Sequence, residues 1–366
     1  MKATCSRSGL REALRIVSGV VDPRNIKPIL KDIRLRTVEG ALELSATDLE
    51  VGIKYFVRDV EVTEEGGLVV PADPLNGIVT ESREERLALS LEESVLVVRG
   101  QGSKFNIMGV SEEEFPDIPD FPSENSLDIE GAILGEMIEK TIFAVAVEKQ
   151  RYALNGILFE AKEKSPRLTM VGTDGRRLAM IKRKANSASP FSCSVIIPVK
   201  ALQQLQKMAD GQEIVKINVM ERRVLFRTED AVLVAQLVEG RFPPYREVVP
   251  DDHDKKLEIS SEEFANAIRQ AAVLSARESR AVCLSMKGDS MIVESSSAES
   301  GEAHVEIPVK FEGDPLEIRF NSDFLLDGLK VVGDEQVRFG MKDAARAAVL
   351  KTGGGYLYLI MPITQD

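Results

Sequence analysis

The stretch LSATDLEVGIKY at residues 44–55 returns in altered form as TMVGTDGRRLAMIK at residues 169–182. Each stretch places a Thr-Asp pair between two runs in which apolar and polar residues alternate, and the pairs begin 126 residues apart (47 to 173). Alternation with period two is typical of antiparallel strands that have one buried and one solvated face. A strand–turn–strand unit that recurs at this distance predicts the repetition of a whole domain.

Other segments support the repetition. Two pairs recur at nearly the same distance: LVVPADPLNGIV (68–79) with VIIPVKALQQL (195–205), and EEFPDIP (113–119) with GRFPPYREVVP (240–250). A fainter third copy begins near Leu257 and is identified by the order of its elements. We therefore predict three domains, at residues 1–122, 123–252 and 253–366. Proline-rich, extended connectors at 115–126 and 241–254 are expected to join them, because proline disfavours both helix and strand ladders.

Each copy is expected to contain one helix, several strands, a second helix and further strands. In the first helix Leu10, Leu14 and Val17 form an apolar stripe. Strands are predicted at 33–37, 41–45, 51–56 and 59–63 and, after the second helix, at 86–91, 95–100 and 104–109. Ser260 and Glu263 predict a capping box at the start of the third copy's first helix. The pattern indicates an α+β fold made of three repeated domains, each with two helices packed on antiparallel sheets.

The composition is that of a globular protein. The 366 residues are 43% hydrophobic and 29% charged, and this length favours two or three domains. No stretch is apolar enough to span a bilayer, and no signal-peptide core follows Arg7 and Arg11, so export is not expected. Cys5, Cys193 and Cys283 lie far apart without a CxxC pair. They predict neither a disulfide framework nor a zinc site, and they indicate a reducing cytoplasm.

Side chains that usually carry catalysis are scarce. We expect the only two histidines, His253 and His304, at the exposed surface, and neither belongs to a metal-binding HExxH. No phosphate-binding glycine loop or GxSxG elbow is present, and Gly353–Gly355 predicts a hairpin turn. The repetition of the Thr-Asp pairs at equivalent turns favours a structural role. We therefore expect no catalytic residues, metal or cofactor. The alternative is a carboxylate-based hydrolase on a repeated scaffold.

Positive charge gathers near the N-terminus of a chain whose net charge is −12. The first 31 residues contain seven basic residues against the two acidic residues Glu12 and Asp22. Further basic residues lie on or just after expected helices: Lys149, Arg151, Lys200, Lys207, Arg269, Arg277 and Arg280. Taken alone, these are ordinary solvated helix residues. In a repeated fold they can instead form one shared positive surface, which would contact phosphates without reading bases.

Four segments carry a family resemblance: RYALNGILFE (151–160), VGTDGRRLA (171–179), EGRFPPYREVVP (239–250) and YLYLIMPI (356–363). With ALRIVSGVV (13–21) and KPIL (27–30), they resemble the bacterial DNA polymerase III beta subunit, the DNA sliding clamp. The resemblance covers the full length in the family's domain order. It implies a DNA clamp fold that closes as a ring homodimer, with helices facing a central hole that holds duplex DNA.

The resemblance also assigns residues. It implies DNA contacts at Arg24, Lys149, Arg151, Tyr152 and Lys200. It implies a dimer interface at Phe105, Ile107, Val273 and Leu274. The family's partner-peptide pocket carries over to Leu154, Thr173, Gly175, Arg176, Arg177, Leu178, Pro243, Asn321, Phe324, Ala348, Leu359, Ile360, Met361 and Pro362.

Three positions depart from the family's pattern. Arg176 stands where histidine is frequent, Glu247 where some members have arginine, and Ser279 where an aromatic residue can stand. The pocket has a structural alternative, in which Leu359–Ile363 is only a final core strand.

The implied partners are sequence-independent duplex DNA, a second copy of the chain, the replicative polymerase catalytic subunit and the clamp-loader ATPase. Other proteins with a clamp-binding motif complete the set: repair and translesion polymerases, mismatch repair proteins and ligase. The implied location is the cytoplasm, in association with the nucleoid, and no membrane is involved. A general peptide-binding scaffold without a DNA role is the remaining alternative.

Overall fold

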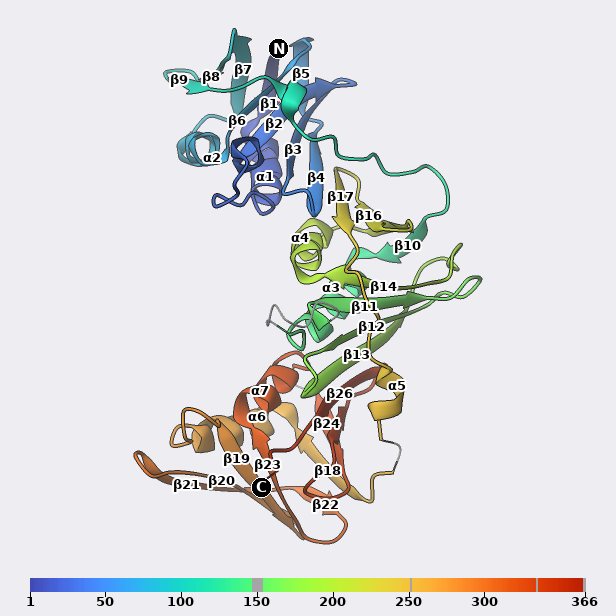
Figure 1. The fold of residues 1–366 in the computed structure, drawn as a ribbon. Helices are drawn as coiled ribbons and strands as arrows, with labels where there is room; N and C mark the ends of the chain where they lie inside the picture. The colour runs from blue at the N-terminus through green and yellow to red at the C-terminus, as the bar shows by residue number, and fades with distance from the viewer. Residues whose placement is uncertain (147–153, 251, 334, 365–366) are drawn as a thin grey trace. The chain divides into compact units, whose positions relative to one another are not determined.

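A computed structural model describes residues 1–146, 154–250, 252–333 and 335–364 (Figure 1). The chain divides into two compact units. Unit 1 comprises Met1–Gly135, Ala185–Phe191 and Lys200–Leu237, and unit 2 comprises Glu136–Lys184, Ser192–Val199 and Val238–Asp366. Helix α3 (Gly131–Ile142) begins in unit 1 and ends in unit 2.

Unit 1 holds two antiparallel sheets. Its remaining elements are β1 (Lys2–Ser6), α1 (Arg7–Val17), η1 (Pro28–Lys31), β2 (Asp32–Val38), β3 (Ala41–Thr47), β4 (Val51–Val57), β5 (Val60–Glu64), β6 (Gly67–Pro71), α2 (Ala72–Glu81), β7 (Arg86–Glu92), β8 (Val95–Arg99), β9 (Lys104–Met108), η2 (Glu112–Glu114), β10 (Leu127–Glu130), α4 (Val199–Ala209), β15 (Ile214–Val219), β16 (Arg223–Arg227) and β17 (Ala231–Gln236). One sheet has the order β5-β1-β7-β8-β9, and the other has the order β10-β15-β16-β17-β4-β3-β2-β6.

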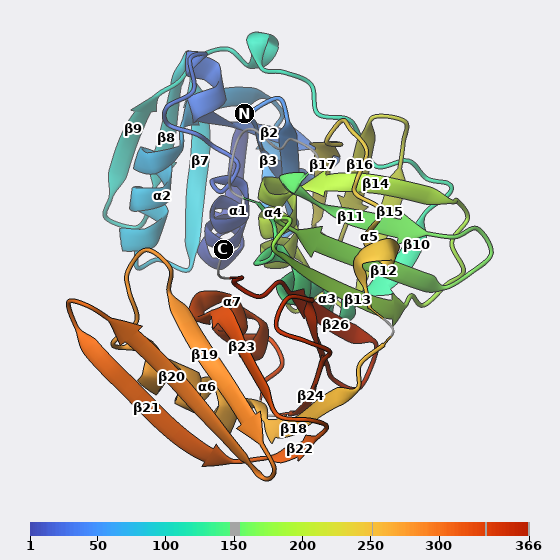
Figure 2. The ribbon, with the colours of Figure 1, turned by 60° about the horizontal axis from the view of Figure 1, so that its bottom comes forward.

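Unit 2 is built in the same way. Its elements are β11 (Gly156–Ala161), β12 (Arg167–Thr173), β13 (Arg177–Lys184), β14 (Cys193–Pro198), α5 (Tyr245–Val248), β18 (Lys255–Ser260), α6 (Ser261–Ala272), β19 (Ala281–Lys287), β20 (Ser290–Ser297), β21 (Gly301–Pro308), β22 (Lys310–Glu312), β23 (Leu316–Asn321), α7 (Ser322–Lys330), β24 (Gln336–Met341), β25 (Ala348–Lys351) and β26 (Tyr356–Ile360). Its sheets have the orders β14-β11-β12-β13-β26-β25-β24-β18-β22 and β21-β20-β19-β23. Figure 2 shows α6 and α7 against the second of these sheets.

The sheets reveal how the repeats are joined. The strands β1–β9, β10–β17 and β18–β26 form three repeats with the order strand, helix, strands, helix, strands, and the second repeat has one strand fewer between its two helices. The first repeat continues its sheet into the second through β4 and β17, and the second continues into the third through β13 and β26. We call these places, with their connectors at 115–126 and 241–254, the first and second junctions. The predicted α+β fold of three repeats is confirmed.

The expectation of one solvated face per strand is wrong at the first junction. Nearly every residue of β3 and β4 is buried. Helix α1 covers one face, where Gly9 approaches Val57, and the connector covers the other, where Ile118 lies against Gly52. Two layers of cover bury both sets of alternating side chains.

Both connectors depart from the simple extended segments expected. Phe115 and Ile118 of the first connector are buried. The second connector contains one helical turn, α5, which follows Pro244 as its N-cap. Proline fits this place because the first turn of a helix needs no donor from it. Phe242 and Tyr245 of this connector are buried as well.

The Thr-Asp pairs have the structural role that their repetition predicts. At the first turn, Thr47 Oγ1 donates to the carbonyl of Val51, and Asp48 Oδ1 accepts from the backbone N–H of Val51 at 2.7 Å. At the second turn, Thr173 Oγ1 donates to the carbonyl of Arg177 at 2.6 Å. There Asp174 Oδ1 accepts from the backbone N–H groups of Arg176 and Arg177. The same Asx-type closure thus stands at both junctions.

Three smaller predictions have mixed outcomes. Ser260 is the N-cap of α6, but its side chain makes no capping hydrogen bond, so the predicted capping box is wrong. His253 is half-buried and its ring lies against Gly340, so it is not the exposed residue expected. His304 is exposed, with Nδ1 2.9 Å from the carboxylate of Glu294. The turn at Gly353–Gly355 between β25 and β26 is confirmed, with Gly354 and Gly355 at positive φ.

Corresponding positions of the junctions differ in polarity. The strand registers align one row of side chains across each sheet, on the face toward the connector: Arg34, Ser45, Lys54, Val232 and Arg227 at the first junction, and Leu158, Val171, Met180, Leu357 and Lys351 at the second. In the next row, Glu43 of the first junction corresponds to Thr169 of the second. Arg34 Nη2 donates to Glu43 at 2.9 Å, and both residues are buried.

This buried pair generates a stability prediction. Arg34→Leu leaves the Glu43 carboxylate buried without its cation, so we expect the free energy of unfolding to fall by about 3–5 kcal/mol. Adding Glu43→Thr copies the second junction at both positions and should recover most of the loss, because the unpaired charge is gone. Urea unfolding followed by circular dichroism measures both changes. A double variant as unstable as the single one would contradict this account.

Candidate partner-binding and DNA-contact sites

The second junction brings the predicted pocket residues together in unit 2. Strand β13 pairs with β26, so that Leu178 faces Leu359, and β26 pairs with β25, so that Ile360 faces Ala348. All four side chains are buried. The second connector joins them, because Phe242 and Tyr245 pack in one cluster with Leu178 and Leu359. Leu178 and Leu359 therefore belong to an apolar base on the connector face, whereas Ile360 and Ala348, in register with Arg177, are buried on the opposite face of the sheet.

Arg177 is the polar centre of this site. Its guanidinium bonds Asp174 at 3.1 Å and Asp327 of α7 at 2.6 Å, and it donates to the carbonyl of Phe143 at 2.8 Å. It also lies 4.4 Å from the ring centroid of Phe324, within cation–π range. These contacts fix α7 to the β12–β13 turn. The guanidinium is therefore hydrogen-bonded to groups of the protein itself.

The rim of the site is solvent-accessible. Met361 follows β26 and is 42% exposed, while its backbone N–H bonds the carbonyl of Arg176 at 2.9 Å. Gly175, Arg176 and Pro243 are exposed, and Pro362 is half-buried. The alternative of a final core strand fits Leu359 and Ile360. It does not fit Met361, an apolar side chain held at the surface by strand-like pairing.

Two other predicted residues have structural duties. Asn321 caps α7, since its Oδ1 accepts from the backbone N–H groups of Asp323 and Phe324. Its oxygen is therefore not free for a peptide, and only its amide nitrogen, 3.4 Å from the carbonyl of Ser279, remains adaptable. Thr173 is the other, since its hydroxyl donates to the carbonyl of Arg177 within the turn. Leu154 is buried.

Sequence reasoning missed the side chains that hold this site together. Tyr358 donates to the carbonyl of Phe324 at 2.8 Å, and burial raises the pKa of its phenol, which keeps it protonated. Tyr245 of α5 donates to Glu160 at 2.6 Å, and its pKa is raised by burial and then by that carboxylate. Glu247 and Ser279, where the chain departs from the family's pattern, are both exposed. The match of Phe242 with Phe115 in the sequence could have indicated that each connector packs against the sheet at its junction.

Of the predicted DNA contacts, Lys149, Arg151 and Tyr152 lie outside the described residues. The side chain of Arg24 is 91% exposed in the loop after α1. Lys200 on α4 bonds the carboxylate of Asp48 and the carbonyl of Val20, the latter at 3.1 Å. Lys200 therefore fastens α4 to the β3–β4 turn, and a phosphate would have to compete with Asp48 for its ammonium.

The predicted interface residues separate into exposed and buried groups. Phe105 is 39% and Val273 76% exposed, and Leu274 is half-buried. Ile107 is buried, although alternation in β9 puts it on the same side of the strand as the exposed Phe105. Its contact with a partner stays a prediction, and Met108, 71% exposed, is a further accessible apolar residue of β9.

Within the part of the chain that the structure describes, catalytic groups do not gather at any of these places. Burial raises the pKa of the Cys5 thiol to about 12 and that of Cys193 to about 11, so neither supplies a thiolate near neutral pH. Among the described residues, no three His, Cys, Asp or Glu side chains are placed to hold a metal ion. Within the same ranges, no helix is long and apolar enough to cross a membrane.

Three α+β repeats whose sheets continue from one repeat into the next are the architecture of the clamp class of proteins. Family models of the DNA polymerase III beta subunit match residues 1–119 (N-terminal domain), 128–244 (central domain) and 246–364 (C-terminal domain). The chain belongs to the DNA polymerase III beta subunit family.

Individual relatives agree along the whole chain. A Vibrio cholerae protein named "Beta sliding clamp" is 33% identical over 367 residues, covering 99% of this chain and all of the relative. The crystal structure of the beta subunit from Thermotoga maritima matches with a TM-score of 0.93 at 29% identity, and that from Pseudomonas aeruginosa bound to griselimycin with 0.94 at 31%. Both comparisons cover 100% of each chain.

Proposed function

We propose that two copies of this chain close into a ring around duplex DNA and that the second junction receives the peptides of its partners. Family membership makes the chain a sliding clamp, a processivity subunit of the replicative polymerase without catalysis of its own. The residues that carry each task in this chain form the proposal.

Two edge strands that have no partner strand on their outer side in the described chain, β9 and β21, support the proposal of a ring. At both junctions the last strand of one repeat pairs antiparallel with the edge strand of the preceding repeat, β17 with β4 and β26 with β13. The last strand of the first repeat, β9, and the corresponding edge strand of the third, β21, have no such partner within their sheets. An exposed edge with apolar residues favours pairing with another chain. Pairing β21 with β9 of a second copy, twice, satisfies both edges and closes a two-fold ring.

The apolar residues near these edges support the same seam. Phe105 and Met108 lie on β9, and Val273 and Leu274 follow α6. In the first junction the corresponding segment after α1 receives α4, where Gln204 donates to the carbonyl of Gly19 at 2.8 Å. The segment after α6 in the third repeat corresponds to the segment after α1 in the first repeat. We therefore propose that α2 of the second copy packs against the segment after α6.

Light scattering tests the seam. We expect about twice the mass of one chain at micromolar concentration. Phe105→Asp and Leu274→Asp each bury a charge in the seam and should weaken the dimer by about 2 kcal/mol or more. Ile26→Asp, at a residue that is 96% exposed away from both edges, is the control and should leave the mass unchanged. A monomeric parent chain would refute the ring.

The helices supply the proposed DNA contacts. Exposed basic residues occur on α1, α4, α6 and α7: Arg11, Lys207, Arg269 and Lys330, with Arg24 in the loop after α1. A protein with a net charge of −12 binds DNA poorly as a whole, so its hold on DNA is best explained by enclosure. Contacts to phosphate then allow sliding without sequence preference.

Retention on DNA tests this part of the proposal. Once loaded by a clamp-loader ATPase, the protein should persist on circular duplex and leave linear duplex at its ends. The double variant Arg24→Glu and Lys207→Glu should shorten retention on circles by about tenfold at moderate salt, because two phosphate contacts become repulsive. Arg338→Glu, an 80% exposed charge on a sheet, should not. Equal retention of the parent on circles and linear duplex would contradict sliding.

The proposed peptide site combines a deep apolar base with the exposed rim at Met361, Pro243 and Arg176. An extended peptide with leucine and phenylalanine, such as Gln-Leu-x-Leu-Phe, suits an apolar floor with a polar edge. Asn321 caps α7 and Arg177 forms ion pairs within the protein, so in this proposal both residues shape the site rather than bind the peptide directly. Polymerase and clamp loader would share this site, as would repair polymerases, mismatch repair proteins and ligase.

Met361→Ala tests the peptide site. We expect about tenfold weaker binding of a fluorescent Gln-Leu-x-Leu-Phe peptide by anisotropy, because the side chain forms an exposed wall. Met220→Ala is a matched control, since Met220 is a similarly exposed methionine in unit 1. Both variants should remain folded dimers. Full affinity in a folded Met361→Ala protein would remove the pocket assignment.

Two further assignments are part of the proposal. The domain boundaries at residues 122 and 252 fall in the connectors, outside the helices and strands of the three repeats. Enclosure of DNA would keep the protein at the nucleoid.

A further inference from the structure

The first junction contains a cleft of about 470 Å³ on the sheet face that the connector crosses. It occupies the same place as the apolar cluster of the second junction. Phe115 and Val234 of the first junction correspond in connector and register to Phe242 and Leu359 of the second. The scaffold that holds a peptide site at one junction is therefore present at the other.

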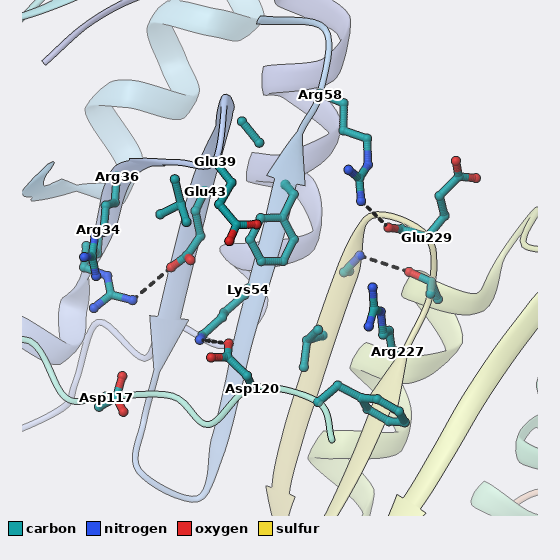
Figure 3. Close-up of a pocket in the computed structure, with 17 residues that line it drawn as sticks. Arg34, Arg36, Glu39, Glu43, Lys54, Arg58, Asp117, Asp120, Arg227 and Glu229 are labelled. Atoms are coloured by element: carbon teal, nitrogen blue, oxygen red, sulfur yellow. Dashed lines mark hydrogen bonds and ion pairs between the residues drawn. The ribbon is translucent and has the colours of Figure 1, made fainter. Parts of the chain in front are cut away.

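The lining of the cleft is charged where the second junction is apolar. Arg34 and Lys54 stand at the positions of Leu158 and Met180. The side chains of Arg34 and Lys54 are each only 7% exposed, and both line the cleft. Burying two cations is costly unless each has a fixed partner. Figure 3 shows Arg34, Lys54 and Arg227, from three different strands, at the walls of one opening.

The partners of these cations are unequal. Arg34 is matched by Glu43, which is itself buried and belongs to the neighbouring strand. Lys54 bonds Asp120 at 2.6 Å, but that carboxylate is 88% exposed and comes from the connector. Arg227 is exposed and has no ion pair among the described residues. Once Asp120 moves aside, neither Lys54 nor Arg227 keeps an ion pair within the described ranges, although Glu39, Glu43 and Glu229 also line the cleft.

The connector shows what chemistry the cleft accepts. Its segment PDIPDFP (116–122) places Asp117, Asp120 and Phe121 against the lining. Apolar contact is available beside the charges from Phe56, Ala231 and Val232. An acidic residue next to an aromatic one is thus already accommodated there by the chain's own sequence.

We propose that this cleft is a second docking site, for an extended acidic segment of a partner protein with two carboxylates three residues apart and an adjoining apolar side chain. One carboxylate replaces Asp120 on Lys54, and the other reaches Arg227. These cations stand two strands apart in one row, with Val232 between them, so they are about 9–10 Å apart across the sheet. Residues i and i+3 of a polyproline-type segment share one face with about the same spacing.

Binding of a labelled peptide tests the proposal. The probe is acetylated PDIPDFP amide with a fluorophore, measured by anisotropy against the full-length protein at low salt. Arg227→Gln and Lys54→Met should each weaken binding by about tenfold, because each removes one charged contact. Lys54→Met installs the residue of the second junction. Asp120→Asn should act in the opposite direction and strengthen binding by about threefold, because it removes the internal competitor.

The controls separate this site from the others. The probe with both aspartates changed to asparagine should not bind. Lys351→Gln, at the position in the second junction that corresponds to Arg227, should leave binding unchanged. The three first-junction variants should bind the Gln-Leu-x-Leu-Phe peptide normally and keep the thermal midpoint of the parent within a few degrees. Failure of that peptide would count against the second-junction site alone.

Three outcomes would overturn the proposal. The first is equal binding of the neutral and acidic probes. The second is an Asp120→Asn protein that binds no better than the parent. The third is inorganic phosphate competing as effectively as the peptide at matched ionic strength, which would make the cleft a simple anion site.

Discussion

Antiparallel pairing between strands of successive repeats is the constraint on which the rest of this structure depends. A repeat ends with a strand whose edge is unpaired, and the edge strand of the preceding repeat satisfies it at β4–β17 and at β13–β26. The backbone supplies this attraction, so it does not depend on which side chains the strands carry. This pairing between repeats occurs twice inside the chain, and it leaves β9 of the first repeat and β21 of the third without a corresponding partner strand. Closure by a second copy is the simplest arrangement that pairs both of these edges.

The turns beside these strand pairs fix the second helix of each following repeat. At the first junction Asp48 receives Lys200 of α4, and at the second Arg177, held by Asp174, receives Asp327 of α7. The charges are arranged differently, but both link a Thr-Asp turn to the helix of the following repeat. The aspartates also close their own hairpins by accepting from backbone N–H groups, which fixes the position of each carboxylate. The ion pairs Lys200–Asp48 and Arg177–Asp327 are therefore equivalent contacts, each of which links a Thr-Asp turn to the second helix of the following repeat.

Much of this could be predicted from the sequence because the repetition is written in short-range patterns. The Thr-Asp pairs, the matching prolines and the stripe of Leu10, Leu14 and Val17 identified the repeats, a helix and the turns, and all three residues of the stripe are buried. Burial of both faces of β3 and β4 could not be read from alternation, because the covering connector is distant in sequence. The same limit applies to β9, where Phe105 and Ile107 share one side of the strand and only Ile107 is buried. Lys200 was assigned from the family resemblance, whereas the position of Asp48 in this chain decides what its ammonium contacts.

The two junctions also show how one backbone scaffold can present opposite chemistry. The row Leu158, Val171 and Met180 adds to an apolar cluster, and its burial is favourable wherever the connector covers it. The row Arg34, Ser45 and Lys54 gains nothing from burial itself, and each cation needs a partner in place, such as Glu43 or Asp120. Because the registers and the turns are the same, the backbone does not force this difference. A buried charged row that apolar residues could replace without changing the strand pairing is costly to keep. These charged residues line an open cleft, and this position, rather than a gain in stability, explains why they are charged.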